Sequence, residues 1–124
     1  MAYEGNIRTV PGIVASGDLS AAQYLFVVLG SSGAAVNTSA GGIVDGVLQD
    51  KPSAAGYAAT VACSGVSKVK ASTTINKGAL VTSTNAGKAV TATTGQTVAG
   101  RALEAAGADG DLIAVLLDTS GVAP

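Results

Sequence analysis

The sequence is a succession of short apolar and β-branched runs, each closed by glycine, serine, asparagine or aspartate. Runs of about four to eight residues bounded in this way are typical of β-strands and are too short for most helices. Their spacing is close to the roughly 8 to 12 residues seen in sandwiches and barrels. We therefore expect an all-β fold, either a compact β-sandwich or a small β-barrel, with about eight short and mostly antiparallel strands.

The expected strands cover most of the chain after residue 20. They are residues 23–29, 34–37, 43–49, 57–63, 66–71, 80–84, 88–93, 97–103 and 111–118. Ser64-Gly65 separates two of these runs and residues 85–87 (NAG) separate two others, so both positions predict tight hairpins. The last run (DLIAVLLD) is apolar throughout its middle, which predicts a central strand or one covered by a partner chain.

The first 20 residues differ from the rest because they contain three glycines and a proline and show no sustained periodicity. We expect residues 1–20 to form an extended arm and residues 21–124 to form a single β domain, since 124 residues fit one domain. Such an arm is either a frayed terminus or a segment that orders against a neighbouring molecule. The short apolar run at residues 10–14 favours the second alternative.

Small side chains fill most of the apolar positions. Hydrophobic residues make up 48% of the chain but aromatic residues only 3%, so alanine and valine dominate the expected core. Charged residues make up 12%, about half of the roughly 25% usual for soluble domains. A weakly charged surface is poorly protected against association. This composition favours a protein that functions while docked on something else.

Residues that carry chemistry are scarce. The chain has no histidine, and so lacks the usual base near neutral pH, the usual partner of a nucleophile and the commonest zinc ligand. The single cysteine, Cys63, excludes an intrachain disulfide and a multi-cysteine metal site, and we expect it to fill core space. We therefore predict that the protein is not an enzyme and has no catalytic residue, cofactor, metal site or small-molecule substrate.

Two short motifs resemble binding loops but are incomplete. Gly87-Lys88 lacks the flanking glycine and hydroxyl residue of a phosphate-binding loop. Residues 109–111 (DGD) resemble the start of a calcium loop, but the closing glutamate is missing. Because aspartate and glycine favour turns, we expect residues 109–111 to form a turn into the last strand.

Neither nucleic acid nor membrane is an expected partner. The formal net charge is −1 and the seven basic residues are scattered, so there is no electrostatic footprint for nucleic acid. No stretch reaches the roughly 18 apolar residues needed to cross a bilayer. The N-terminus has no apolar core of signal-peptide length, which predicts a protein made in the cytoplasm.

Two parts of the chain resemble a known protein family. Residues 100–106 (GRALEAA) and 110–117 (GDLIAVLL) are similar to the C-terminal signature of capsid cement, or head decoration, proteins of tailed bacteriophages. The middle of the chain also resembles this family, at residues 42–52 (GIVDGVLQDKP) and 76–78 (NKG). The resemblance spans residues 40–117.

The resemblance implies a structural protein that binds the outer surface of an assembled phage head and bridges major capsid protein subunits to stabilise it. It places the protein on the capsid exterior of the virion, after synthesis in the host cytoplasm. The implied partners are the major capsid protein and the chain itself, as a homotrimer or, alternatively, a dimer. The alternative function is a phage fibre or adhesin-like β module that binds a receptor, although so few aromatic residues disfavour a glycan ligand.

Candidate interface residues lie in the expected arm and near the C-terminus. Their side chains are aromatic, apolar or charged and are suited to contact with the capsid or a second subunit. They are Tyr3, Ile7, Arg8, Val10 and Ile13 in the arm, and Arg101 and Glu104 in the closing segment. Arg101 and Glu104 form either a local, solvent-facing ion pair or a pair across a subunit interface.

Overall fold

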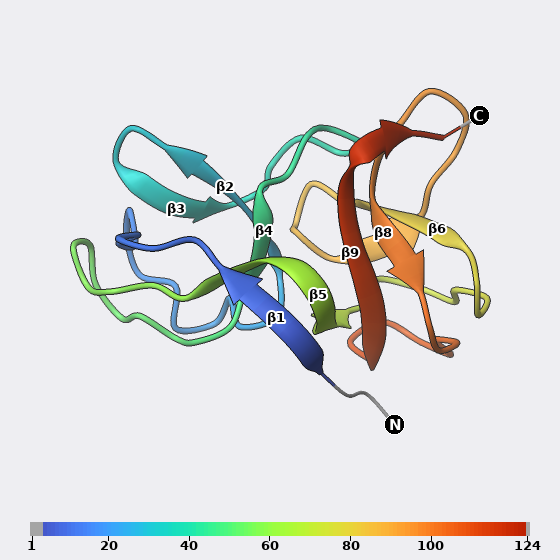
Figure 1. The fold of residues 1–124 in the computed structure, drawn as a ribbon, viewed down its shortest axis with the longest axis horizontal. Coiled ribbons are helices and arrows are strands. Elements are labelled where there is room, and N and C mark those ends of the chain that lie inside the picture. Colours follow the sequence, from blue (N-terminus) through green and yellow to red (C-terminus); the bar gives the residue numbers. More distant parts are fainter. Residues whose placement is uncertain (1–3, 124) are drawn as a thin grey trace.

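The structure is a computed structural model that describes residues 4–123, and within this range the chain forms strands and no helix (Figure 1). This confirms the predicted all-β class. The strands are β1 (Gly5–Thr9), β2 (Phe26–Gly30), β3 (Gly33–Val36), β4 (Gly46–Leu48), β5 (Val61–Lys70), β6 (Leu80–Ser83), β7 (Ala89–Thr91), β8 (Thr97–Ala102) and β9 (Leu112–Val122).

All of these strands belong to one antiparallel sheet that curls into a half-barrel (Figure 1). The order is β3-β2-β4-β5-β9-β8-β6-β7, and β1 pairs with β5 outside this path. Ala62 of β5 pairs with both β4 and β1, and Val66 pairs with both β9 and β1. Because a residue in an antiparallel ladder has one partner on each side, β4 and β9 share one edge of β5 and β1 occupies the other.

The hairpin predicted at Ser64-Gly65 is wrong, because β5 runs through these residues as one strand and pairs Gly65 with Leu117 of β9. Gly65 has a φ of 94°, and the register to β1 shifts beside it. Ala62 and Val69 both face the main apolar cluster, although residues an odd number apart in a regular strand face opposite sides. Ser64-Gly65 therefore acts as a β-bulge that reverses the alternation of side chains.

Two other local predictions are confirmed. Residues 85–87 join β6 to β7 as a hairpin, with Ser83 opposite Ala89. The closing strand β9 is central, because it lies between β5 and β8. Its Ile113 and Val115 are buried inside the curl of the sheet.

Two apolar clusters hold the sheet together, one on each face of β2 and β4. Phe26 of β2 and Val47 of β4 belong to the main cluster, which lies inside the curl together with β9. Their neighbours Val27 and Leu48 belong to a second cluster. Successive residues of a strand point to opposite faces, so β4 and the buried start of β2 are packed on both sides, which explains their uninterrupted apolar sequences.

Most of the expected arm contacts the rest of the domain. β1 pairs with β5, and the segment that follows contributes Ala15 and Leu19 to the second cluster. Ala15 also forms a bridge with Ala34 of β3. Residues 13–25 therefore cover the side of β2 and β4 that points away from the main cluster. The division into an arm of residues 1–20 and a domain of residues 21–124 stays a prediction.

Candidate interaction surfaces

The described residues contain no cluster of side chains suited to bind a metal ion. Within residues 4–123, side chains of cysteine, aspartate and glutamate do not gather in groups of three that could hold a metal ion. This part of the chain also has no pocket. No helix long and apolar enough to cross a membrane occurs among the described residues.

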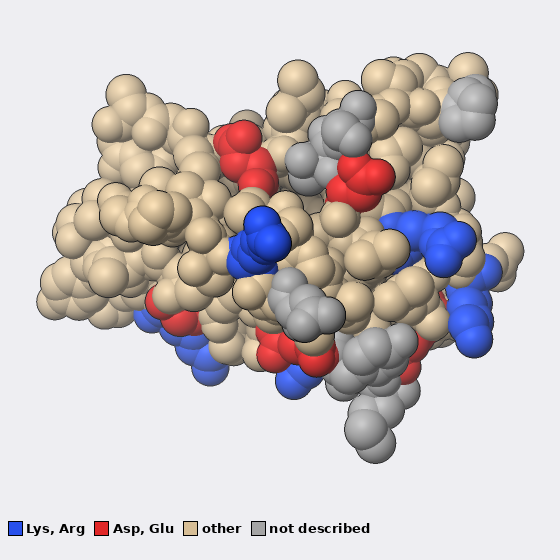
Figure 2. Space-filling view, viewed as in Figure 1, with Lys and Arg blue, Asp and Glu red and all other residues tan. Residues whose placement is uncertain are grey.

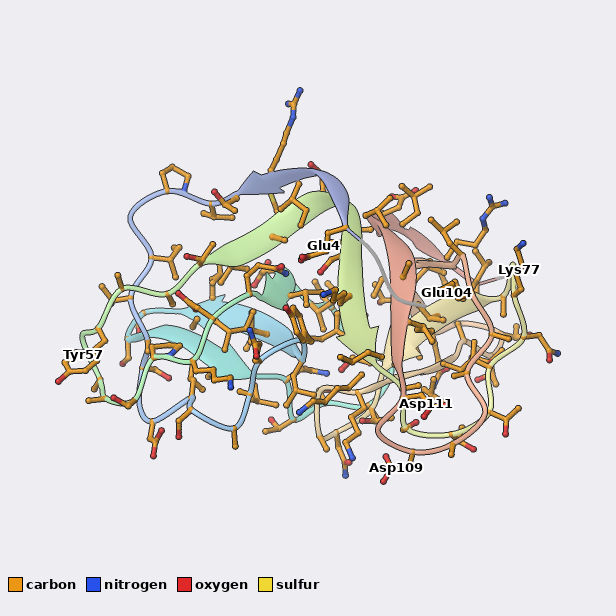
Figure 3. The ribbon with its side chains drawn as sticks, turned by 90° about the horizontal axis from the view of Figure 1, so that it is seen from below. Glu4, Tyr57, Lys77, Glu104, Asp109 and Asp111 are labelled. Atoms are coloured by element: carbon orange, nitrogen blue, oxygen red, sulfur yellow. The ribbon has the colours of Figure 1, made fainter. Side chains whose placement is uncertain are left out.

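The turn predicted at residues 109–111 is confirmed. Gly110 has a φ of 89°, which favours glycine, and the Asp111 carboxylate accepts hydrogen bonds from the backbone N–H groups of Gly107 (2.9 Å) and Ala108 (3.2 Å). Asp109 instead forms an ion pair with Lys88, with 2.8 Å between Oδ1 and Nζ. Figure 3 shows Asp109 and Asp111 at this turn. Both carboxylates thus have partners within the protein.

The arm candidates differ in how they are placed. Arg8 is exposed on β1, whereas Ile7 is half-buried against the main cluster and Ile13 against the second. Val10 is half-buried, and its N–H donates to the carbonyl oxygen at the start of β5 (3.1 Å). Tyr3 lies outside the described residues. The role of these residues at an interface stays a prediction.

The two candidates near the C-terminus lie in different surroundings. Arg101 is exposed on β8, with Leu80 of β6 and Leu116 of β9 as its cross-strand partners. Glu104 is half-buried, and its Oε1 accepts a hydrogen bond from the backbone N–H of Ala114 (2.9 Å). Glu104 therefore fixes the loop after β8 against β9. A role for either residue in an interface stays a prediction.

The outer face of the sheet exposes leucines that sequence reasoning did not single out. We define the outer face as Val66, Leu80, Arg101, Leu112 and Leu116. Four of these residues form one cross-strand row from β6 to β5, and Leu112 lies further along β9. Leu112 and Leu116 are 40% and 41% exposed, while their neighbours in β9 point into the core. The first six residues of β9, Leu112 to Leu117, are all apolar, and this uninterrupted run hides the alternation.

A second exposed surface lies at one end of the molecule. We define the charge-free end as residues 10–16, 30–35 and 53–59, three segments without any Asp, Glu, Lys or Arg. In Figure 2 the left end of the molecule shows neither blue nor red, and Figure 3 places Tyr57 at the same end. Tyr57 is 57% exposed and lies before β5, although the sequence predicted a strand over residues 57–63. The strand begins only at Val61, after the turn that carries Tyr57.

Backbone hydrogen bonds hold the three segments of this end together. The N–H of Ala15 donates to the carbonyl oxygen of Tyr57 (2.8 Å), and the N–H of Gly56 donates to that of Ala15 (2.9 Å). On the other side, the N–H of Ala34 donates to the carbonyl oxygen of Val14 (2.9 Å). Residues 13–16 therefore form the middle of a small, ordered surface. No sequence motif predicted this surface.

Charged groups begin at the border of this end. Hydrogen bonds from the side chain and the backbone N–H of Ser20 hold the pKa of the Asp18 carboxyl below its ordinary value. Asp18 is therefore ionised at neutral pH. Asp50 accepts from the backbone N–H of Thr60, with 3.1 Å to its Oδ1. These carboxylates are fixed by local contacts and mark the limit of the uncharged surface.

Comparisons with known proteins agree with this architecture. A family model described as phage cement protein matches residues 5–117, from β1 into β9. Among solved structures, the chain is similar to the N base of head fibre gp8.5 of bacteriophage phi29, with 21% identity and a TM-score of 0.64. That similarity covers 82% of this chain and 88% of the other, and it shows a shared fold. No curated protein sequence matches the chain.

Proposed function

This chain belongs to the phage cement protein family, and from that premise we propose that it binds the outer surface of an assembled phage head and bridges neighbouring major capsid protein subunits. The family is structural and non-enzymatic, and the chain is accordingly a component of the phage head and not an enzyme. The family match over residues 5–117 is the observation that carries the proposal.

The physical character of the surface supports a protein that works by contact. Burial of a charge without a partner costs far more than burial of an uncharged polar group, and burial of apolar groups is favourable. Because only 12% of its residues are charged, this chain can bury large parts of its surface against a shell without burying unpaired charges. A clamp that stabilises subunits needs such contact and no active site.

We further propose that the protein self-associates, as a homotrimer or else a dimer, through the outer face. Subunits held together would each contact a different capsid subunit, and individually weak contacts would then add up through avidity. Sedimentation equilibrium of the wild type and of Leu116→Asp tests this. Loss of the oligomer in the variant supports the proposal, and a monomeric wild type contradicts it.

Electron microscopy of the native particle tests the main proposal. Density for the protein at regular positions on the outer surface of the head, in contact with more than one capsid subunit, is the expected result. Density confined to a tail tip would contradict it and would favour an adhesin-like module.

The second candidate function is that of a phage fibre module. The observation in its favour is the likeness to the N base of a head fibre, at a TM-score of 0.64. A fibre base would also sit on the head, but it would carry material that projects away from the shell. The same micrographs separate the two functions, because a cement protein leaves density close to the shell.

A further inference from the structure

We infer that the charge-free end is the surface that seats this protein on the major capsid protein, with Tyr57 as its anchor. This inference rests on the proposed function and names the contact surface that the function requires. It commits to an uncharged part of the outer capsid surface as the occupant.

The first argument is charge. The chain has 15 charged side chains, seven basic and eight acidic, yet none lies in residues 10–16, 30–35 or 53–59. A charged partner surface would lose its water against this end and gain no ionic partner in return, which is unfavourable. The partner that matches this end is therefore uncharged and presents small or apolar groups.

The second argument is the pair of exposed apolar side chains on neighbouring segments. Val14 is 40% exposed. It forms an isolated antiparallel β-bridge with Ala58, the residue after Tyr57. Tyrosine is enriched among residues that dominate binding energy, because it offers a large, stiff contact area and a polar tip. Among the described residues, Tyr57 is the one aromatic residue that is exposed, since Tyr24 is half-buried and Phe26 is buried.

The third argument is order. The segments are joined by the backbone hydrogen bonds described above, and Ala59 adds another from its N–H to the carbonyl oxygen of Ile13 (3.0 Å). Ala15 and Ala34 are buried beneath the exposed side chains. A surface already ordered in the free protein loses little conformational entropy on binding.

Binding of purified protein to undecorated heads tests the inference, with three variants. Tyr57→Ala and Val14→Asp are expected to weaken binding at least about tenfold, the loss typical of a hot-spot residue. Ile43→Ala is the matched control, because Ile43 is 71% exposed and apolar but lies outside the charge-free end. It is expected to bind like the wild type. Circular dichroism and sedimentation of each variant report its fold and its mass.

Each outcome is decisive. Weaker binding by both variants, at unchanged fold and mass, supports the inference. Unchanged binding by both folded variants overturns it and leaves the proposed function intact. A changed oligomeric mass for Tyr57→Ala would make this end a subunit contact and would also overturn the inference. A wild type that does not bind heads overturns the proposed function and, with it, the inference.

Discussion

Asn37 shows how a single buried polar residue stabilises a protein whose core is built mainly of alanine and valine. Its side chain is buried, and its Nδ2 donates to the hydroxyl of Ser83 on β6 (2.9 Å). Its Oδ1 accepts from the N–H of Ser39 (3.2 Å). The amide thus fixes the loop after β3 to a strand that is distant in the sheet order.

Asn37→Ala is expected to lower the free energy of unfolding by about 1–3 kcal/mol, because the buried hydroxyl and backbone groups lose their partner. Denaturant unfolding followed by circular dichroism measures the change. Thr38→Ala, at an exposed neighbouring position, is the control. Equal midpoints for Asn37→Ala and the wild type would contradict the role given to the amide.

Gly46 is required by close approach of two strands. A Cβ on this residue would meet the carbonyl oxygen of Ala62 in β5. Gly46→Ala is therefore expected to destabilise the protein by about 1–3 kcal/mol, as overpacking does. Gly17→Ala is the matched control, because a Cβ there meets nothing within 4 Å. Thermal unfolding of both variants checks this, and equal melting temperatures would refute it.

Burial of single residues was only partly predictable from the sequence. Phe26 is buried in the core, but Tyr57 is exposed, and Cys63, which was expected to fill core space, is only half-buried. All three lie in apolar runs, so their local sequences look alike. The exposure of Tyr57 depends on where the turn before β5 ends, and that of Cys63 depends on which strand covers β5. Neither is a local property of the sequence.

At the scale of elements, the bulge in β5 explains both a success and a failure of sequence reasoning. The strand class was predictable, because β-branched runs closed by glycine mark strands wherever they pair. Ser64-Gly65 was misassigned because a hairpin turn and a bulge both use a glycine with positive φ. Pairing with β9 decides between the two, because Leu117, about 50 positions further along the chain, pairs with Gly65 and keeps β5 continuous.

Gly65→Ala is expected to destabilise the protein by about 1–3 kcal/mol, because alanine is strained at a φ of 94°. Ser64→Ala, in the preceding residue, serves as the control and should change stability less. Urea unfolding of the two variants measures the difference. Equal stability of both variants would contradict the bulge.

Deletion of residues 1–9 is expected to weaken binding to heads while the β domain stays folded. The second cluster begins at residue 13, and β1 contributes only the half-buried Ile7 to the main cluster. Arg8→Ala separates the contribution of the exposed charge from that of the strand. Binding at wild-type affinity by the folded, truncated protein would contradict a role for this segment.

At the scale of the whole molecule, charged residues are few and none lies in the charge-free end. This distribution predicts how binding to heads responds to salt. Contacts made by an uncharged surface are not screened by ions. The affinity for heads should therefore change less than about twofold between roughly 50 and 500 mM salt. Titration at several ionic strengths checks this, and a steep loss of affinity with salt would indicate a contact made by Arg8, Arg101 or the lysines.

The order of the strands in the sheet was beyond sequence reasoning. Local patterns predicted nearly every strand and the central place of β9, but not that β4 and β9 share one edge of β5. That arrangement depends on pairings between distant segments, which leave no periodic signal. The charge-free end was equally hidden, because three separate segments build it.

The shared edge of β5 also has a mechanical meaning. The start of β5 is tied to β4 beside the charge-free end, and its later part is paired with β9 at six residues, from Gly65 to Lys70. A pull between the start of β5 and the start of β9, which lie at opposite ends of this antiparallel ladder, would run along the strands and load the β5–β9 ladder in shear. Hydrogen bonds loaded in shear resist together, whereas those at a peeling edge break one after another. This layout would let a protein whose core is built mainly of small side chains resist stretching in that direction.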